Sequence, residues 1–529
     1  MSKAPASRDR QPEDQRGWVE KELSLIVARR REIVGQLDAA NRELAAARRD
    51  ASRLSSRRAV RIALAAVRAG RPLRSLPSVL RRVAPVAVRV RGGVPAGSSP
   101  SVASNRPTPA GFRTALQDRL GREDGARAVV VDRPDAPVAE LRGADILAVT
   151  TPDFDVRTIR GPVTVAIIGG SGQAWLDAPW LDDFDIVATA EPATRDAIAA
   201  RRAKAPTLAP DPFASVTDMV AAWLATRRVG IAVGIPRWEE APAWGDLHFA
   251  RALQRQFERN GHPTRVHILP DWGDDVSARD DVSLHLFGLR PRPRLPGQLN
   301  LLWVISHPDK VSDQMAAAYD RIYVASDVFA GQLAQRTAVP VAPLHQATDP
   351  ERFHPDPTGP RHDVLFVGNS RGMRRDILAD LTPTTLGLAV YGQGWTSELL
   401  DPAYLCGDHV PNEELHRYYS SAGIVLNDHW ADMRASGFFS NRLYDALASG
   451  ACIVSDHVDG IEAEFDGAIV TYTEPARLRF TIHDLLMDPD RRKALAERGR
   501  AAVLERHTFA ARAARILADI EQTTPAGPG

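Results

Sequence analysis

The chain has 529 residues, 44% of them hydrophobic and 25% charged, and its net charge at pH 7 is +1. This length is too great for one hydrophobic core and predicts about two to four domains, while the composition is that of a soluble globular protein. The polar start and the lack of any run of about 18 apolar residues predict neither a signal peptide nor a membrane-spanning helix. With only Cys406 and Cys452, a disulfide framework and a cysteine-based zinc site are excluded, and a reducing, cytoplasmic setting is favoured.

The beginning of the chain is predicted to lie outside the globular part. Residues 1–17 are expected to be disordered, and residues 18–55 carry apolar side chains at three- and four-residue spacing between charged ones. This pattern favours a coiled-coil helix through which the chain forms a homo-oligomer. A single amphipathic helix packed on its own protein is the alternative.

Residues 56–110 are predicted to be a basic amphipathic segment followed by a flexible linker. Between Arg53 and Gly93 there are eleven arginines and no acidic residue, so the rest of the chain carries a net charge of −10. Apolar residues between the arginines favour an anionic membrane surface, and the absence of aromatic residues argues against nucleic acid. A solvated arginine-rich linker is the alternative.

Two segments with a similar order of helices and strands follow. Residues 111–227 contain four apolar runs that predict buried strands, and residues 228–358 repeat the order of elements more closely than the residue identities. We interpret this as an internal duplication of a Rossmann-like half. The first copy lacks the polar strand-end residues of the second, which predicts a degenerate repeat.

Polar residues follow two predicted strands of segment 228–358. Gly245 and Asp246 end the long loop after the first strand, and His307 and Asp309 follow a later one. Ligands of α/β proteins bind at this carboxyl edge of the sheet. The alternative is that Asp246 or His307 only caps the helix that comes next.

In segment 359–522, an apolar strand that ends at Gly368 leads into a loop with three arginines. Glycine lets the backbone approach a ligand, and guanidinium groups suit phosphate. The candidate phosphate-binding residues of this loop are Arg371, Arg374 and Arg375.

The stretch 428–456 is predicted to be a loop, a helix from Arg442 and a buried strand. The free N–H groups and the positive dipole of such a helix entry favour a diphosphate. Asp445 lies one turn further in, within reach of a ribose diol. An ordinary α/β loop with an N-cap Ser or Asn is the alternative. The candidate ligand-binding residues here are Ser436, Gly437, Phe438, Ser440, Asn441 and Asp445.

The run N-R-L-Y-D-A-L-A-S-G-A-C-I-V-S-D, residues 441–456, resembles the donor-binding segment of group-1 glycosyltransferases with the two-Rossmann (GT-B) architecture. It is most similar to their CgeB-like, spore-maturation branch. The resemblance covers about 229–520 and implies an acceptor-side domain at 228–358, a nucleotide-sugar domain at 359–522 and a tail at 523–529. It also implies that the last helix, from Phe509 to Ile520, crosses back to the acceptor-side domain.

The resemblance implies transfer of a sugar from a nucleoside diphosphate sugar to a hydroxyl acceptor by an enzyme that needs neither metal nor cofactor. Together with the basic segment, it favours a glycan or lipid-linked acceptor of cell-envelope polysaccharide or glycoconjugate synthesis. The same segment favours a cytoplasmic enzyme that is peripheral at the inner face of the membrane. Asp445 would hold the ribose, and arginines of the 371–375 loop the diphosphate. His307, with Asp246 or Asp309, would orient or deprotonate the acceptor.

Two other functions stay open. Many relatives carry a second Glu at the position of Gly437, so a non-catalytic GT-B scaffold or assembly protein is one alternative. Another nucleotide-sugar enzyme of the same architecture, such as an epimerase, is the second. The sequence does not decide whether the anomeric configuration would be retained or inverted.

Overall fold

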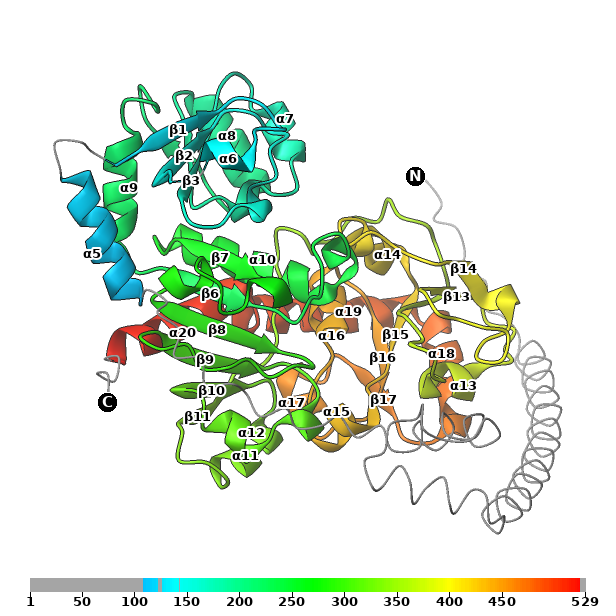
Figure 1. Cartoon of the computed structure of the whole chain (residues 1–529). Coiled ribbons are helices and arrows are strands. Elements are labelled where there is room, and N and C mark those ends of the chain that lie inside the picture. The colour runs from blue at the N-terminus through cyan, green and yellow to red at the C-terminus, as the bar shows by residue number, and fades with distance from the viewer. Residues whose placement is uncertain (1–107, 122–125, 142, 524–529) are drawn as a thin grey trace, which may run out of the picture. The chain divides into compact units, whose positions relative to one another are not determined.

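In the computed structural model, the described residues are 108–121, 126–141 and 143–523 (Figure 1). The predicted disordered start, coiled-coil helix and basic segment, up to residue 107, and nearly all of the tail lie outside them and stay predictions. The described strands form three sheets in which every strand pair is parallel. The predicted α/β class is therefore confirmed.

The first domain is a five-stranded sheet with the order β1-β2-β3-β4-β5. Its inner strands are continuous runs of Val, Ile, Leu, Ala and Thr, as strands covered on both faces require. The strands are β1 Ala128–Val131, β2 Ile146–Val149, β3 Val163–Ile168, β4 Ile186–Thr189 and β5 Thr207–Leu208. The helices are α5 Pro109–Leu120, α6 Val138–Leu141, α7 Gln173–Asp177, α8 Pro192–Arg201 and α9 Val216–Ala225.

The second domain is a six-stranded sheet with the order β11-β10-β9-β8-β6-β7. The order reverses between β6 and β8, and such a reversal opens a crevice at the carboxyl ends of the two strands. The strands are β6 Val229–Ala232, β7 Thr264–His267, β8 Val282–Phe287, β9 Leu299–Val304, β10 Arg321–Val324 and β11 Val341–Pro343. The helices are α10 Gly245–Arg259, α11 Asp313–Ala316 and α12 Asp327–Ala334.

The predicted duplication of these two domains is not supported. The order β2-β3-β4-β5 does correspond to β8-β9-β10-β11, but β6, which lies between β7 and β8, has no counterpart in the described part of the first domain. There β1 pairs directly with β2. The alternating apolar runs of the sequence reflect two related α/β sheets and do not establish one repeated unit.

The third domain is a six-stranded sheet with the order β14-β13-β12-β15-β16-β17, which reverses between β12 and β15. The strands are β12 Val364–Val367, β13 Leu388–Tyr391, β14 Leu405–Gly407, β15 Ile424–Asn427, β16 Ile453–Asp456 and β17 Val470–Tyr472. The helices are α13 Asp376–Leu381, α14 Leu415–Ser421, α15 Ala431–Ala435, α16 Asn441–Ala448, α17 Ile461–Glu464, α18 Pro475–Met487 and α19 Pro489–Arg506.

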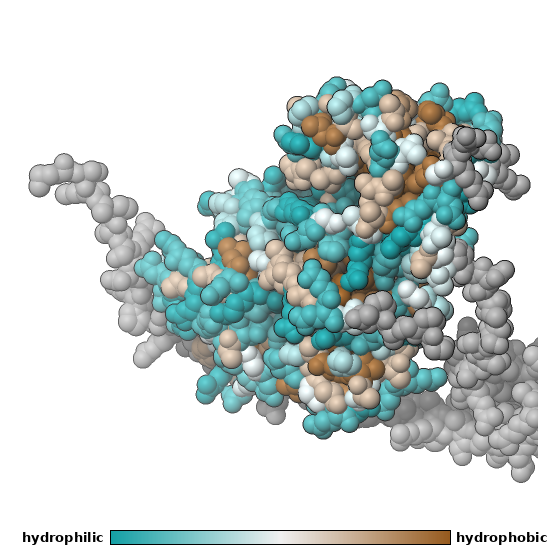
Figure 2. Space-filling model, turned by 90° about the vertical axis from the view of Figure 1, so that its left-hand side faces the viewer, coloured by the Kyte–Doolittle hydropathy of each residue, from teal (hydrophilic) through white to brown (hydrophobic). Residues whose placement is uncertain are grey.

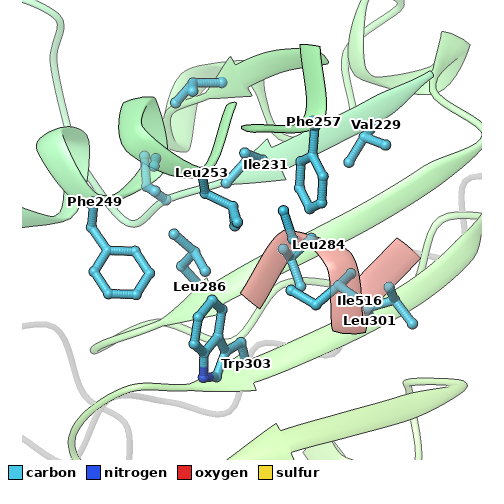
Figure 3. Close-up of a cluster of buried hydrophobic side chains, with 14 of the residues drawn as sticks. Val229, Ile231, Phe249, Leu253, Phe257, Leu284, Leu286, Leu301, Trp303 and Ile516 are labelled. Atoms are coloured by element: carbon cyan, nitrogen blue, oxygen red, sulfur yellow. The ribbon is translucent and has the colours of Figure 1, made fainter. Parts of the chain in front are cut away.

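The last helix, α20 Phe509–Gln522, follows the third domain but packs into the core of the second. Figure 3 shows Ile516 of this helix among Leu284 and Leu301 of the second sheet. Phe509 meets Phe249 of α10 edge to face, with ring centroids 4.6 Å apart. The predicted return of the last helix is confirmed.

Hydrophilic residues predominate on the face drawn in Figure 2, and the hydrophobic patches on it are small and separate. Within the described residues, no helix has both the length and the apolar character needed to cross a bilayer.

Candidate active site

Two cavities lie between the second and third domains and share one wall. Cavity 1 has a volume of about 410 Å³ and cavity 2 of about 320 Å³. The shared wall is formed by the carboxyl end of β12 and the entry of α16, beside the point where the third sheet reverses its order. This is where an open α/β sheet binds its ligand. The residues that line both cavities are Gly368, Asn369, Arg371, Ser440, Asn441 and Arg442.

The entry of α16 presents polar groups to both cavities. Ser440 is the residue before the helix, and its backbone N–H donates to Nε2 of His429 at 3.0 Å. Nδ2 of Asn441 donates to Asp445 at 2.8 Å, whereas its buried Oδ1 has no partner among the described residues. The opposite face of α16 is apolar and fixes the helix in the core of the third domain.

Arg442 is a cation at the shared wall to which the sequence pattern assigned no role. Its Nη1 donates to Oδ1 of Asn427 at 3.0 Å, and its guanidinium lies 4.8 Å from the ring centroid of Phe366. Burial lowers the pKa of Arg442, and no carboxylate among the described residues forms an ion pair with it. A cation enclosed in this way is stabilised by an anionic ligand, and its fork suits phosphate.

The three predicted arginines of the loop after β12 occupy different surroundings. Arg371 is exposed and lines both cavities without an ion pair in the described chain. Arg375 is buried, with Nε 2.9 Å from Asp428 and its guanidinium 4.4 Å from the ring centroid of Trp430. Arg374 is exposed and lines neither cavity. Arg371 is therefore the member of the predicted trio that remains free for a phosphate.

Asp445 lies in cavity 1, one turn inside α16. Its carboxylate accepts hydrogen bonds from Oγ1 of Thr348 and Nδ2 of Asn441, each at 2.8 Å. Burial raises the pKa of Asp445 to about 8, against the opposing effect of the Thr348 hydrogen bond. A diol that donates to this carboxyl would stabilise its ionised form.

The opposite side of cavity 1 carries a polar chain from α10 to the third domain. Nε2 of His248 donates to the carbonyl of Pro242 at 2.9 Å, which leaves Nδ1 to accept from Arg352 at 3.1 Å. Arg352 also donates to Oδ1 of Asn412. Gly245, at the start of α10, lines the same cavity, as predicted for the loop that meets the cleft.

Cavity 2 holds Asp246 and His307, both from the second domain. Asp246 is in the first turn of α10, where Trp244 is the capping residue, so the N-cap alternative is wrong. Burial raises the pKa of Asp246, and this carboxyl has no hydrogen-bond or ion-pair partner among the described residues. Such a carboxyl is available as a proton acceptor.

His307 follows β9 with a φ of 54° and is the N-cap residue of the short 3-10 helix Pro308–Lys310, as the capping alternative predicts, but its side chain makes no capping hydrogen bond. Its Nδ1 lies 2.9 Å from Oγ of Ser306, and burial lowers its pKa. Only three described residues other than glycine have a positive φ, and two of them, His307 and Arg371, line cavity 2. Backbone strain of this kind is concentrated at functional sites.

Asp309 is separate from this group. It is exposed, lines neither cavity and pairs with Nζ of Lys310 at 2.6 Å. Asp246 and His307 line the same cavity, whereas Asp309 lies outside it, although its charge acts against the burial that lowers the pKa of His307.

Three residues predicted to bind the donor lie outside both cavities. The side chain of Phe438 is fully buried in a core with Phe329 of α12, and the carbonyl of Ser436 accepts from Oγ of Ser326 at 2.6 Å. Gly437 has a φ of 70°, and a Cβ there would lie 3.0 Å from Val328. These residues pack against the second domain. The close contact with Val328 and Ser326 explains the small residues 436 and 437, and the shared core explains the aromatic residue 438.

Residues 371–518 match a family model described as "Glycosyl transferase-like". The match covers most of the third domain and extends into α20. Comparison with curated proteins finds no match.

Several solved structures are similar over 56% of this chain. Among them are the sucrose-phosphate synthase (tll1590) of Thermosynechococcus elongatus (14% identity, 98% of that chain, TM-score 0.44), AviGT4, a glycosyltransferase involved in avilamycin A biosynthesis (15%, 97%, 0.41), and T4 phage BGT in complex with its UDP-glucose substrate (13%, 99%, 0.41).

Proposed function

We propose that this protein is a glycosyltransferase that moves a sugar from a nucleoside diphosphate sugar to a hydroxyl acceptor. The observation that supports this most is the shared wall, where Arg371 and Arg442 face two cavities without an ion pair in the described chain. A diphosphate at this wall would place a nucleoside in cavity 1, beside Asp445, and a sugar in cavity 2. The glycosyl transferase-like match over 371–518 covers the same wall on the third-domain side.

The chemistry follows from the charges. When the bond between the sugar and the diphosphate breaks, negative charge develops on the leaving oxygen, and Arg371, Arg442 and the N–H groups at the entry of α16 would stabilise it. The acceptor hydroxyl must lose a proton as it bonds to the anomeric carbon. Asp246, which lines cavity 2, would take that proton, and His307 would orient the hydroxyl.

The scaffold alternative loses part of its support. It drew on Gly437, which stands where many relatives carry a glutamate. A side chain there would meet Val328 and Ser326, so glycine is explained by domain packing at a position outside the cavities. The epimerase alternative keeps the same donor site and differs only in lacking an acceptor.

Donor binding is tested by a thermal-shift screen of the full chain against UDP-, GDP-, dTDP- and CDP-sugars. A ligand that binds only the folded state at 100 times its Kd stabilises it by about 2.7 kcal/mol. We expect a shift with one nucleotide, lost in Asp445→Ala and kept in the matched control Asp309→Ala, which lies outside both cavities. No shift with any donor would favour the scaffold.

Turnover separates the enzymes. A glycosyltransferase releases the nucleoside diphosphate in proportion to glycosylated acceptor, whereas an epimerase changes the sugar in the absence of an acceptor. If a donor binds but neither reaction is observed with it, both enzymatic functions are contradicted.

The finer parts of the proposal rest on the sequence: the CgeB-like branch, a glycan or lipid-linked acceptor of the cell envelope, independence of metal, self-association, and attachment to the membrane through the basic segment. Among the described residues, no three His, Cys, Asp or Glu side chains are grouped to hold a metal ion. Liposome flotation with Arg→Ser variants of residues 53–93 tests the membrane. Unchanged binding to anionic vesicles would remove that part.

A further inference from the structure

Three consecutive polar residues stand at the carboxyl end of β15, and each is hydrogen-bonded to a different part of the cavity walls. Asn427 is the last residue of the strand, and Asp428 and His429 follow it. Residues 427–429 directly follow the apolar run of the strand and are buried. Oδ1 of Asn427 accepts a hydrogen bond from Nη1 of Arg442 at 3.0 Å, and the carboxylate of Asp428 accepts one from Nε of Arg375 at 2.9 Å. Nε2 of His429 accepts one from the backbone N–H of Ser440 at 3.0 Å.

His429 is held by Asp456, the last residue of the neighbouring strand β16. One oxygen of Asp456 accepts from Nδ1 of His429 at 2.6 Å, and the other accepts from the backbone N–H of His429 at 3.1 Å. The side chain of His429 is 0% exposed. Because Nδ1 donates to the carboxylate, Nε2 is left as an acceptor, and the ring can hold the Ser440 N–H.

This hydrogen bond acts on the residues that face the cavities. Ser440 directly precedes Asn441 and Arg442, so the position of its N–H sets the direction in which α16 begins. Asn427 fixes the guanidinium of Arg442 from the other side and is itself held by Ser455, whose Oγ accepts from Nδ2 at 3.0 Å. A displacement of about 1 Å at a binding group can cost about 100-fold in rate.

We propose that residues 427–429, with Asp456, form a positioning layer that fixes the diphosphate-binding groups Asn441 and Arg442. His429 is its central positioning residue, and the ligand it serves is the diphosphate of the donor or product. This inference rests on the proposed function, because it assigns the wall between the cavities to a diphosphate.

Two substitutions of His429 separate its two hydrogen bonds. In His429→Gln the amide oxygen can reach the position of Nε2 and accept from the Ser440 N–H, while the bond to Asp456 is lost. In His429→Asn the shorter amide can still donate to Asp456 but cannot reach Ser440. Each variant loses one buried hydrogen bond. The bond lost in His429→Gln is to a carboxylate, so this variant should lose more stability while keeping the contact that positions Ser440.

The probe is inorganic pyrophosphate, titrated calorimetrically into the full chain. We expect His429→Asn to weaken its affinity about 10-fold to 100-fold, because a displaced Arg442 makes weaker charge-assisted hydrogen bonds to the anion, and His429→Gln to stay within about 3-fold of the parent. Amide hydrogen exchange of residues 440–442, measured without ligand, is expected to be faster in His429→Asn only. If neither variant folds, Asn427→Ala is the substitute, because it removes the Oδ1 that holds Arg442 without adding a charge, and the affinity should fall to the same extent.

An equal loss of affinity in both variants, following their melting temperatures, would overturn the inference, as would a parent chain that does not bind pyrophosphate. Sugar transfer is measured separately. The expected affinity pattern without any transfer would reject the proposed function and leave the positioning layer standing. If sugar transfer is observed but His429→Asn binds pyrophosphate as tightly as the parent, the positioning layer is rejected and the proposed function stands.

Discussion

Arg442 and Arg374 provide a matched comparison at the scale of single residues. Both are arginines of the third domain, but Arg442 lines both cavities and Arg374 is exposed outside them. A hydrogen bond to a charged group contributes about 1.5–3 kcal/mol, so we expect Arg442→Gln to weaken nucleoside diphosphate binding about 10-fold to 150-fold. Affinity for the nucleoside should be unchanged, and Arg374→Gln should bind as the parent does. Calorimetric titration with the nucleoside and its diphosphate measures both; equal effects of the two substitutions would contradict the assignment.

The pKa of Asp445, raised to about 8 by burial, predicts a pH dependence of stability. In the unfolded chain the pKa of an aspartate is about 3.9, so between about pH 4 and 8 the folded state binds a proton that the unfolded state does not. Stability therefore falls as the pH rises through this window. Asparagine resembles the protonated carboxyl and does not titrate.

We therefore expect Asp445→Asn to gain stability relative to the parent from pH 5 to pH 8, by at least about 1 kcal/mol, close to the value of one pKa unit. Urea unfolding at both pH values gives the difference, and Asp309→Asn, at an exposed position, is the control. A difference between Asp445→Asn and the parent that does not change with pH would show that this carboxyl is ionised in the folded chain.

At this scale the sequence predicted several residues that line the cavities and others that do not. Asp246, His307, Arg371 and Asp445 line the two cavities, because strand ends and helix entries bring polar residues of distant segments to one sheet edge. Arg442 was missed because it falls within an amphipathic helix pattern, which does not distinguish a cavity from solvent. The polar run 427–429 after an apolar strand was the available signal for the positioning layer.

The segment 436–438 joins two domains at the scale of elements, and Gly437 tests it. Its φ of 70° disfavours a side chain, and a Cβ would also meet Val328 at 3.0 Å. Gly467 has a φ of 66° with no atom within 4 Å of its Cβ position, so Gly467→Ala isolates the backbone term, about 1–2 kcal/mol. We expect Gly437→Ala to cost about 1–3 kcal/mol more, as overpacking does. Denaturant unfolding measures both, and equal costs would show that Val328 moves away freely.

Secondary structure was predictable where burial is complete. Strands such as β3, β9 and β12 are continuous apolar runs because both faces of a parallel sheet are covered. The short helix α15, inside a stretch predicted as loop, was missed because five residues carry no periodicity. Helix α10 begins at Gly245, earlier than its apolar pattern indicates, since the first turn faces a cavity and needs no apolar residue.

At the scale of the whole molecule, α20 makes the second domain depend on the end of the chain. The helix follows the third domain, yet its apolar face completes the core over β6, β8 and β9. The predicted crossing of this helix came from the family resemblance, because an amphipathic pattern states that a face is buried and leaves its partner open. The same holds for the relation between the first and second domains, where sequence order alone suggested a repeat that the sheet order does not show.

Substitutions on the buried and the exposed face of α20 are expected to lower the free energy of unfolding by very different amounts. Ile516 is fully buried among side chains of the second sheet, whereas Arg515 beside it is 57% exposed and pairs with Asp519. We expect Ile516→Ala to lower the free energy of unfolding by about 2–5 kcal/mol, from lost burial and the cavity left behind, and Arg515→Ala by no more than about 0.5 kcal/mol. Calorimetry measures the effect, and the part of the tryptophan fluorescence that is lost in Trp303→Phe locates it, because Trp303, one of ten tryptophans, lies in the core that Ile516 completes. Ile516→Ala could instead shift only unfolding transitions in which the fluorescence of Trp303 does not change. In that case α20 would stabilise the third domain alone, and its packing in the core of the second domain would be wrong.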